Sequence, residues 1–269
     1  MSVVSNRFDL TGKIALVTGG ATGIGKAIAQ LLVESGAKML IGSRRTDVVE
    51  AAVKEIARAT ETDETNEAEP QVSGVGLDVT QDNSVQRAIR RAVDLYGTLD
   101  ILVNCAGFTI RKPTFELSIE EFQSIMDVHV TGSLRCAQAA GRLMREQHAG
   151  AIINIASIAG YADMSEITGY TTAKSGIFGL TYALANEWAQ FGIRTNAIAP
   201  GFVPTDMNRK LIEGTDRGRR VLERTPMGRF GRADEIAGAA VYLASPAASF
   251  VNGSILVVDG GFLACGVKD

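Results

Sequence analysis

The sequence is poor in the residues that stabilise disulfide-rich or metal-bound folds. Its 269 residues include only three cysteines, Cys105, Cys136 and Cys265, and no C-x-x-C spacing. An odd number of cysteines without that spacing predicts neither a disulfide framework nor a zinc site, and we expect no metal. Cysteine usage of this kind is typical of a reducing compartment, so a cytoplasmic protein is expected.

Charge of one sign and long apolar segments are also scarce. The net charge is −3 and no extended basic run occurs, so no nucleic-acid partner is expected. The first 13 residues lack the apolar core of a signal peptide, and no apolar run reaches membrane-spanning length. We therefore expect a soluble, unprocessed chain without a membrane partner.

Nothing in the sequence divides the chain into parts. It is 46% hydrophobic, shows no internal repeat and has no linker rich in Pro, Gly and Ser, so residues 1–269 are expected to form a single domain. One segment differs from the rest. Residues 60–70, TETDETNEAEP, are acidic and poor in apolar side chains, which predicts a solvated surface insertion.

Strand-like and helix-like segments alternate along the chain. This alternation predicts an α/β fold, a doubly wound, Rossmann-type parallel sheet of seven strands with helices on both faces. Long helices are expected over 120–145 and 170–190. The expected strands are 15–17, 38–41, 74–78, 99–104, 151–156, 194–199 and 255–258.

A glycine-rich turn follows the first expected strand. Residues 18–25 read TGGATGIG and lead into a segment of helical composition. Glycine at Gly19, Gly23 and Gly25 allows a sharp turn and close approach to a pyrophosphate, which the N–H groups of a helix N-terminus can bind. The spacing differs from the common G-x-G-x-x-G, and a plain tight turn is the alternative.

Three polar side chains suggest acid/base chemistry. Tyr170 and Lys174 are four residues apart, so on a helix they share a face. A nearby ammonium group stabilises phenolate and is expected to lower the pKa of Tyr170, making it a general acid/base. Ser157, just after a buried strand, is placed to hydrogen-bond a substrate oxygen. The alternatives are an exposed helix face for Tyr170 and Lys174, and a helix cap for Ser157.

The order of these motifs resembles the short-chain dehydrogenase/reductase family. The resemblance covers nearly the whole chain and includes Asp78-Val79, residues 104–107 (NCAG), Asn196, residues 200–205 (PGFVPT) and residues 251–261 (VNGSILVVDGG). It implies hydride transfer between a nicotinamide cofactor and an alcohol or ketone, with Ser157, Tyr170 and Lys174 as catalytic residues. Lys174 would also bind the nicotinamide ribose. The implied cofactor-binding residues are Gly19, Thr22, Gly23, Ile24, Gly25, Ser43, Arg44, Asp78, Val79, Asn104, Ala106, Gly107, Tyr170, Lys174, Pro200, Gly201, Val203 and Thr205.

The end of the second expected strand favours NADP over NAD. NAD-preferring folds place an acidic residue there for the ribose 2′-OH, whereas this chain has Ser43 followed by Arg44 and Arg45. A guanidinium group can pair with a 2′-phosphate that a carboxylate would repel. Use of NAD as well, with solvated arginines, is the alternative.

One position departs from the family. Where the family usually has an asparagine that holds a water in a proton relay, this chain has His129. Histidine donates and accepts hydrogen bonds and can keep a relay, although a purely structural histidine is the alternative. The other histidine, His148, is expected at the solvated end of a helix.

The substrate is expected to be a sugar acid or a polyol. Arg111 and Lys112 follow the NCAG segment and can receive a carboxylate; with residues 224–231 and 249–253 they resemble the gluconate 5-dehydrogenase and 2-deoxygluconate 3-dehydrogenase branch. The alternatives are a 3-oxoacyl thioester, a cyclic ketone, or a non-catalytic NADP-binding sensor. Residues 205–226 are a candidate lid over the substrate.

Association is expected as well. The two long helices carry more apolar residues than one sheet face needs, and the resemblance implies that these helices form subunit contacts in a homotetramer. The residues concerned are Leu134, Ile177, Phe178, Leu180 and Trp188.

Overall fold

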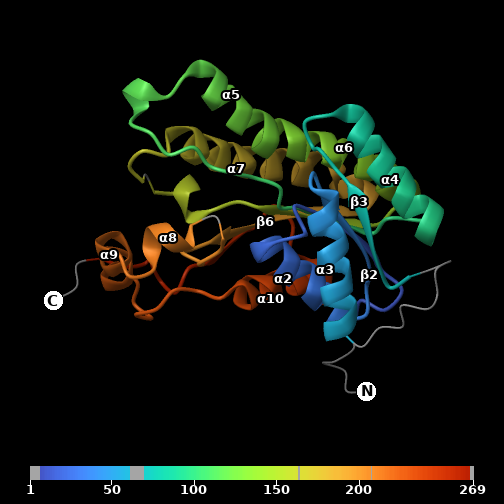
Figure 1. The fold of residues 1–269 in the computed structure, drawn as a ribbon. Helices are drawn as coiled ribbons and strands as arrows, with labels where there is room; N and C mark the ends of the chain where they lie inside the picture. Colours follow the sequence, from blue (N-terminus) through green and yellow to red (C-terminus); the bar gives the residue numbers. More distant parts are fainter. Residues whose placement is uncertain (1–6, 61–69, 163, 207, 267–269) are drawn as a thin grey trace.

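A computed structural model describes residues 7–60, 70–162, 164–206 and 208–266. Seven parallel strands form one sheet in the order β3-β2-β1-β4-β5-β6-β7 (Figure 1). The expected Rossmann-type fold is confirmed. The strands are β1 (Ile14–Thr18), β2 (Lys38–Ser43), β3 (Val72–Gly76), β4 (Ile101–Asn104), β5 (Gly150–Ile155), β6 (Ile193–Pro200) and β7 (Ile255–Val258).

Helices cover both faces of the sheet (Figure 1). One face packs against α2 (Gly23–Glu34), α3 (Thr46–Ala59) and α10 (Ala233–Ala244). The other packs against α4 (Asp82–Tyr96), α6 (Gly132–Gln147) and α7 (Thr168–Trp188). Because helices exclude water from both faces, the central strands are continuous apolar runs; every residue of β1 is buried.

The third strand ends earlier than the expected 74–78. It ends at Gly76, and Asp78 lies in the following turn, where its Oδ1 accepts hydrogen bonds from the backbone N–H and the hydroxyl of Thr80 at 3.0 and 2.8 Å. A carboxylate that binds the backbone two residues ahead favours a turn over a strand. Asp78 and Val79 therefore belong to the loop beyond the sheet.

The expected helix over 120–145 is interrupted. Helix α5 (Ile119–Met126) passes into a π-helical turn over Asp127–Thr131, and α6 follows. The hydroxyl of Ser133, in the first turn of α6, donates to the carbonyl of His129 in the π-helical turn at 2.6 Å. His129 lies inside the turn and is buried. Such turns are frequent at functional sites.

The second long helix is close to the expectation, but its apolar residues have partners inside the chain. Helix α7 begins two residues before Tyr170 and ends at Trp188. Ile177 and Phe178 are buried, and Leu180 and Trp188 pack against core clusters. These four side chains therefore give no structural support for association.

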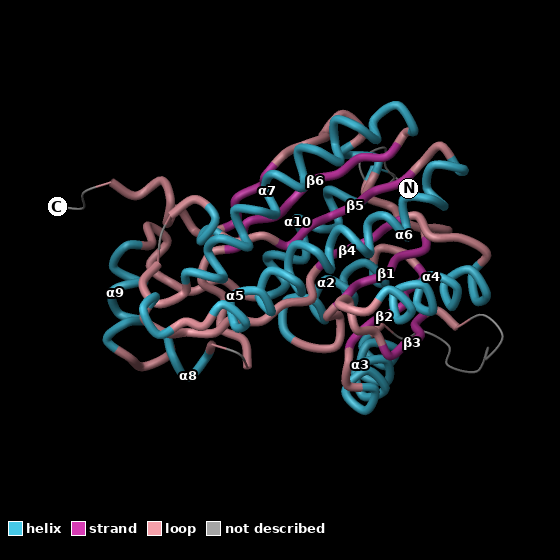
Figure 2. Tube along the Cα trace, turned by 90° about the horizontal axis from the view of Figure 1, so that it is seen from above, coloured by secondary structure: helices cyan, strands magenta, loops and turns pink. Residues whose placement is uncertain are grey.

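Loops gather at the carboxyl edge of the sheet because all the strands are parallel. Helices α8 (Arg209–Ile212) and α9 (Asp216–Arg224) follow β6 and lie together at one end of the molecule (Figures 1 and 2). Both fall within 205–226, which the sequence did not indicate as helical. The acidic insertion cannot be compared in the same way, because its residues 61–69 lie outside the described part of the chain.

Candidate active site

Ser157, Tyr170 and Lys174 meet beyond the carboxyl end of β5. Ser157 follows that strand and hydrogen-bonds the Tyr170 hydroxyl, while its own Oγ accepts from the Ala159 N–H at 3.1 Å. Lys174 lies on the same face of α7 as Tyr170, with Nζ 5.4 Å from the centre of the phenol ring. Lys174 Nζ donates to the Ile155 carbonyl at 2.6 Å. The structure thus brings together the three residues expected to be catalytic.

The electrostatics of this group differ from the expectation. Burial raises the pKa of Tyr170 even though the hydrogen bond from Ser157 acts to lower it, so the expected lowering by Lys174 is wrong for this arrangement. The Lys174 ammonium is directed at the Ile155 carbonyl, and burial lowers its own pKa to about 8. At neutral pH the phenol is protonated and ready to donate a proton to a substrate oxygen.

Cys105 is a neighbour of this group that the sequence did not single out. It follows β4, and a negative charge on its sulfur would act on both Tyr170 and Lys174. Burial raises the pKa of the Cys105 thiol to about 11, so the thiol stays protonated and adds no charge. Its position inside the NCAG segment was the available signal.

His129 joins Tyr170 to the loop after β4. Its Nε2 lies 3.1 Å from the Phe108 nitrogen and 2.7 Å from the Phe108 oxygen, and its ring meets the Tyr170 ring edge to face. Burial, with a smaller contribution from the charge of Lys174, lowers the pKa of His129 to about 3. The imidazole is therefore neutral. A Cβ at Gly107 would overlap this ring, which explains the glycine.

The glycine turn has the close approaches that a pyrophosphate site needs. Gly19 has a φ of 66°, and a Cβ there would lie 2.9 Å from Ala106 Cα; a Cβ at Gly25 would overlap the Gly19 carbonyl. Helix α2 begins at Gly23, which has a φ of 53°, and no side chain of Thr22 caps it. The first-turn N–H groups, including that of Ile24, are left for an anion. These features fit the cofactor that the sequence indicated.

Residues 200–205 lie beside this turn. Strand β6 ends at Pro200, a Cβ on Gly201 would crowd Asp259, and Val203 is buried. A Cβ on Gly23 would lie 3.3 Å from the methyl group of Thr205. The segment after β6 therefore lies beside the start of α2, next to the point between β1 and β4 where the strand order reverses.

Ser43, Arg44 and Asp78 form a second group, at the adjoining end of β2 and the loop after β3. Ser43 ends β2, Arg44 is exposed, and Arg44 forms no ion pair with any other described residue. Burial acts to raise the pKa of Asp78, but the hydrogen bonds from Thr80 and the charges of Arg44 and Arg135 outweigh it and lower the pKa. Arg44 is thus an exposed cation at the end of β2, the position for which the sequence predicts a contact with a 2′-phosphate.

Asn104 has a structural role that the sequence did not reveal. Its side-chain N–H group donates to Asn154 Oδ1 at 2.9 Å, and Asn154 donates to Thr181 Oγ1 at 3.0 Å. All three side chains are buried, so this chain of bonds fixes α7 on β4 and β5. An asparagine inside the apolar segment AIINIA was the available signal.

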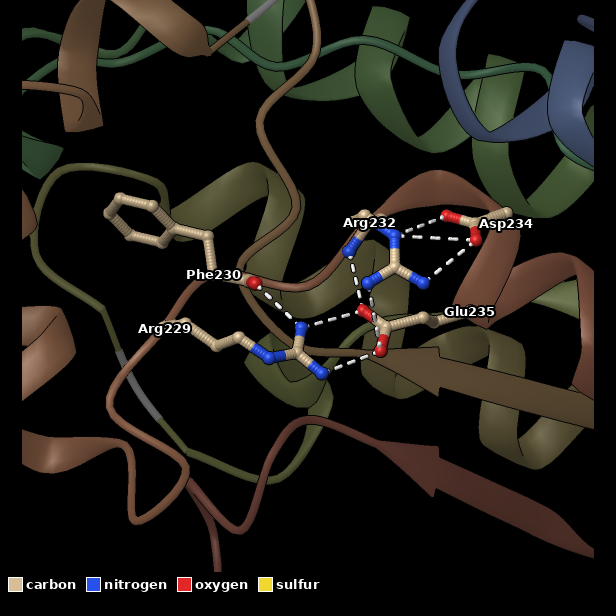
Figure 3. Close-up of polar contacts among 5 residues, drawn as sticks. All are labelled: Arg229, Phe230, Arg232, Asp234 and Glu235. Atoms are coloured by element: carbon tan, nitrogen blue, oxygen red, sulfur yellow. Dashed lines mark hydrogen bonds and ion pairs between the residues drawn. The ribbon is translucent and has the colours of Figure 1, made fainter.

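The segment that returns from α9 is anchored by charge. Arg229 pairs with Glu235 at 2.6 Å, and Arg232 pairs with Asp234 at 2.9 Å, at the start of α10 (Figure 3). The hydrogen bond from Arg229 lowers the pKa of Glu235 to about 2, so the carboxylate stays charged. This network lies just beyond residue 226, where the candidate lid ends.

The described residues contain no cluster of three or more His, Cys, Asp or Glu side chains that could hold a metal ion. No helix in the described ranges is both long enough and apolar enough to cross a membrane.

Comparison with known proteins agrees with this geometry. A family model described as enoyl-(acyl carrier protein) reductase matches residues 19–263. The 2-dehydro-3-deoxy-D-gluconate 5-dehydrogenase of Bacillus subtilis (strain 168) is 38% identical over 266 residues, 98% of this chain and 99% of that protein. A 3-oxoacyl-(acyl-carrier-protein) reductase of Vibrio harveyi is 38% identical over 253 residues, 94% of this chain and 98% of that protein.

A solved structure also has the same fold as this chain. The crystal structure of a gluconate 5-dehydrogenase from Burkholderia cenocepacia J2315 in complex with NADP and tartrate is 33% identical and superposes with a TM-score of 0.90. The match covers 98% of this chain and 100% of that one. With the matched family model and the conserved architecture, these relatives show that the chain belongs to the short-chain dehydrogenase/reductase family.

Proposed function

We propose that this oxidoreductase uses NADP(H) to interconvert a secondary alcohol and a ketone, with Tyr170 as the general acid/base. The observation that carries the proposal is the grouping of the half-buried Ser157 and Tyr170 with the buried Lys174 at the carboxyl edge of the sheet. A scaffold or sensor has no need for a half-buried phenol beside a buried ammonium, which disfavours the non-catalytic alternative.

We assign the three residues these roles from their chemistry and their grouping in the structure. Tyr170 exchanges a proton with the substrate oxygen, and Ser157 holds that oxygen through its hydroxyl. Lys174 stabilises negative charge that develops on Tyr170 and binds the ribose next to the nicotinamide. The bound cofactor supplies or accepts the hydride.

The preference for NADP rests on Arg44. It is exposed beyond β2, and the end of that strand carries Ser43 in place of a carboxylate. The gluconate 5-dehydrogenase named above was crystallised with NADP. Residues of the glycine turn, residues 104–107 and residues 200–205 hold the rest of the cofactor.

The substrate that we propose is a sugar acid or a related polyol. Support comes from the gluconate-type relatives and from the cations Arg111 and Lys112 in the loop after β4. The structure pairs these cations with Glu166 and Glu121 at 2.6 and 2.5 Å, so their charges are already partly balanced. A 3-oxoacyl thioester is the second candidate, because the Vibrio harveyi relative acts on that class.

Two further properties remain proposals. His129 keeps a place in the proton relay as a neutral imidazole that donates at one ring nitrogen and accepts at the other. The chain assembles as a homotetramer; the exposed aromatic residues Tyr182 and Phe250 are candidates for the contacts. Sedimentation at micromolar concentration tests the tetramer, and a mass near 28.5 kDa would refute it.

The direct experiment is an absorbance assay of NADPH with matched panels of keto sugar acids, keto sugars, 3-oxoacyl thioesters and cyclic ketones. Oxidation of NADPH with the keto sugar acids above all others supports the proposal. A preference for thioesters would favour the second candidate substrate. If NADPH is not oxidised with any panel, the non-catalytic NADP-binding protein would be the better interpretation.

A further inference from the structure

An ion pair joins the two loops that border the catalytic group. Arg111 lies in the loop after β4, and Glu166 lies just before α7, the helix that carries Tyr170. The guanidinium Nη2 contacts Glu166 Oε2 at 2.6 Å, and Nε donates to the same oxygen. Since β4 and β5 are neighbours in the sheet, the loops that follow them start side by side at its carboxyl edge.

The backbone holds Glu166 in this position. Glu166 has a φ of 68°, a left-handed conformation that is energetically unfavourable for any residue other than glycine. The contacts around Glu166 must therefore maintain it. The N–H of Lys112 donates to the Glu166 carbonyl at 2.8 Å, and the hydroxyls of Thr114 and Thr168 are 2.6 Å apart. The Glu166 carboxylate is therefore directed at Arg111 by main-chain contacts as well as by charge.

Arg111 keeps binding capacity despite this pair. One oxygen of the Glu166 carboxylate accepts from two of the Arg111 N–H groups. The guanidinium donates no other hydrogen bond to the described residues. The two side chains are 36% and 41% exposed. A pair this exposed is screened by water and opens at little cost, so another carboxylate can replace Glu166.

We propose that Glu166 is a specificity-determining residue that competes with the carboxylate of an acidic substrate for Arg111. The inference rests on the proposed function, because it concerns how far the same site favours hydroxy acids over neutral polyols, a preference that Glu166 limits. Glu166 balances the charge of Arg111 when no acid is bound. A substrate carboxylate binds the guanidinium only when it displaces the Glu166 carboxylate or shares the guanidinium with it. A neutral polyol has no carboxylate, so Glu166 does not affect its binding.

Lys112 differs from Arg111 in this respect. Its partner Glu121 also accepts the Ser118 N–H in the capping box of α5, so that carboxylate is fixed by the helix. Glu116 offers a better control than Glu121. It is an exposed acid in the neighbouring turn, Thr114–Glu116, so its loss changes the net charge equally without touching Arg111.

The test measures binding to the NADP-loaded protein by calorimetry. The probes are tartrate and threitol, which share a four-carbon skeleton but differ in having carboxylates or hydroxymethyl groups at the ends. Glu166→Gln should tighten the binding of tartrate about fivefold and leave the binding of threitol unchanged. Arg111→Met should weaken tartrate and remove the effect of Glu166→Gln in the double variant. Glu116→Gln should change neither probe.

Three results would overturn the inference: equal tartrate affinity in wild type and Glu166→Gln, an equal shift for threitol, or no measurable tartrate binding by either protein. Each can be told apart from failure of the proposed function. That failure is the absence of NADPH oxidation with every ketone, whereas these results concern binding alone.

Discussion

The imidazole of His129 and the phenol ring of Tyr170 lie edge to face, with ring centroids 5.5 Å apart and an interplanar angle of 88°. Because Nε2 of His129 is also held at the Phe108 backbone, the histidine fixes the distance between the catalytic helix and the loop after β4. Its burial and low pKa mean that it does so as a neutral group.

The first prediction concerns turnover in His129 variants. His129→Asn restores a side chain that donates and accepts, so it should keep much of the activity. His129→Leu has similar bulk but no hydrogen bond, so it should lower turnover and change its pH dependence. Steady-state rates between pH 6 and 9 on folded protein provide the measurement. If the folded Leu variant matches wild type in rate and pH profile, the ring serves packing only.

The same residue should make the protein sensitive to acid. The ordinary pKa of histidine is 6.5, and that of His129 in the folded chain is about 3. Between these pH values the unfolded chain binds a proton that the folded chain excludes, so stability falls as pH decreases below 6.5. At pH 4 the loss from this residue is about 3 kcal/mol. Denaturant unfolding of wild type and His129→Asn should show this difference; parallel pH curves would contradict it.

Gly107 should depend on His129. A Cβ at Gly107 would overlap Cε1 of the ring and lie 2.8 Å from Nδ1, so Gly107→Ala should cost about 1–3 kcal/mol of stability. The cost should shrink when His129→Ser removes the ring, and a double-mutant cycle by thermal unfolding measures that coupling. Additive effects would show that the glycine is required for another reason.

Cofactor preference should depend on Arg44. Arg44→Ala removes a charge-assisted contact with the 2′-phosphate. The binding of NADPH should therefore weaken about ten- to a hundredfold, and the binding of NADH should stay nearly unchanged. Ser43→Asp should shift the preference toward NADH. Dissociation constants from nicotinamide fluorescence test both variants, with Arg45→Ala as the neighbouring control. Equal losses for the two cofactors would mean that Arg44 is only solvated.

The sequence predicted the parts of this molecule that depend on local signals. The seven strands and the glycine turn are evident from apolar runs and from glycines, and the catalytic trio from its order. The π-helical turn was not predictable, because 120–145 has helical composition throughout and the interruption involves contacts such as that of Gly132 with Val79. The direction of the Lys174 ammonium depends on the Ile155 carbonyl, 19 residues away. The Arg111–Glu166 pair likewise requires the neighbouring positions of β4 and β5.

Replacement of Tyr170 by Phe tests the central claim most directly. The change removes one hydroxyl and keeps the ring that packs against His129, so NADPH binding and stability should persist. Turnover with the best ketone of the panel should fall by about two to four decades, the scale of a positioned general acid/base. Near-wild-type turnover in the folded Tyr170→Phe protein would contradict the account.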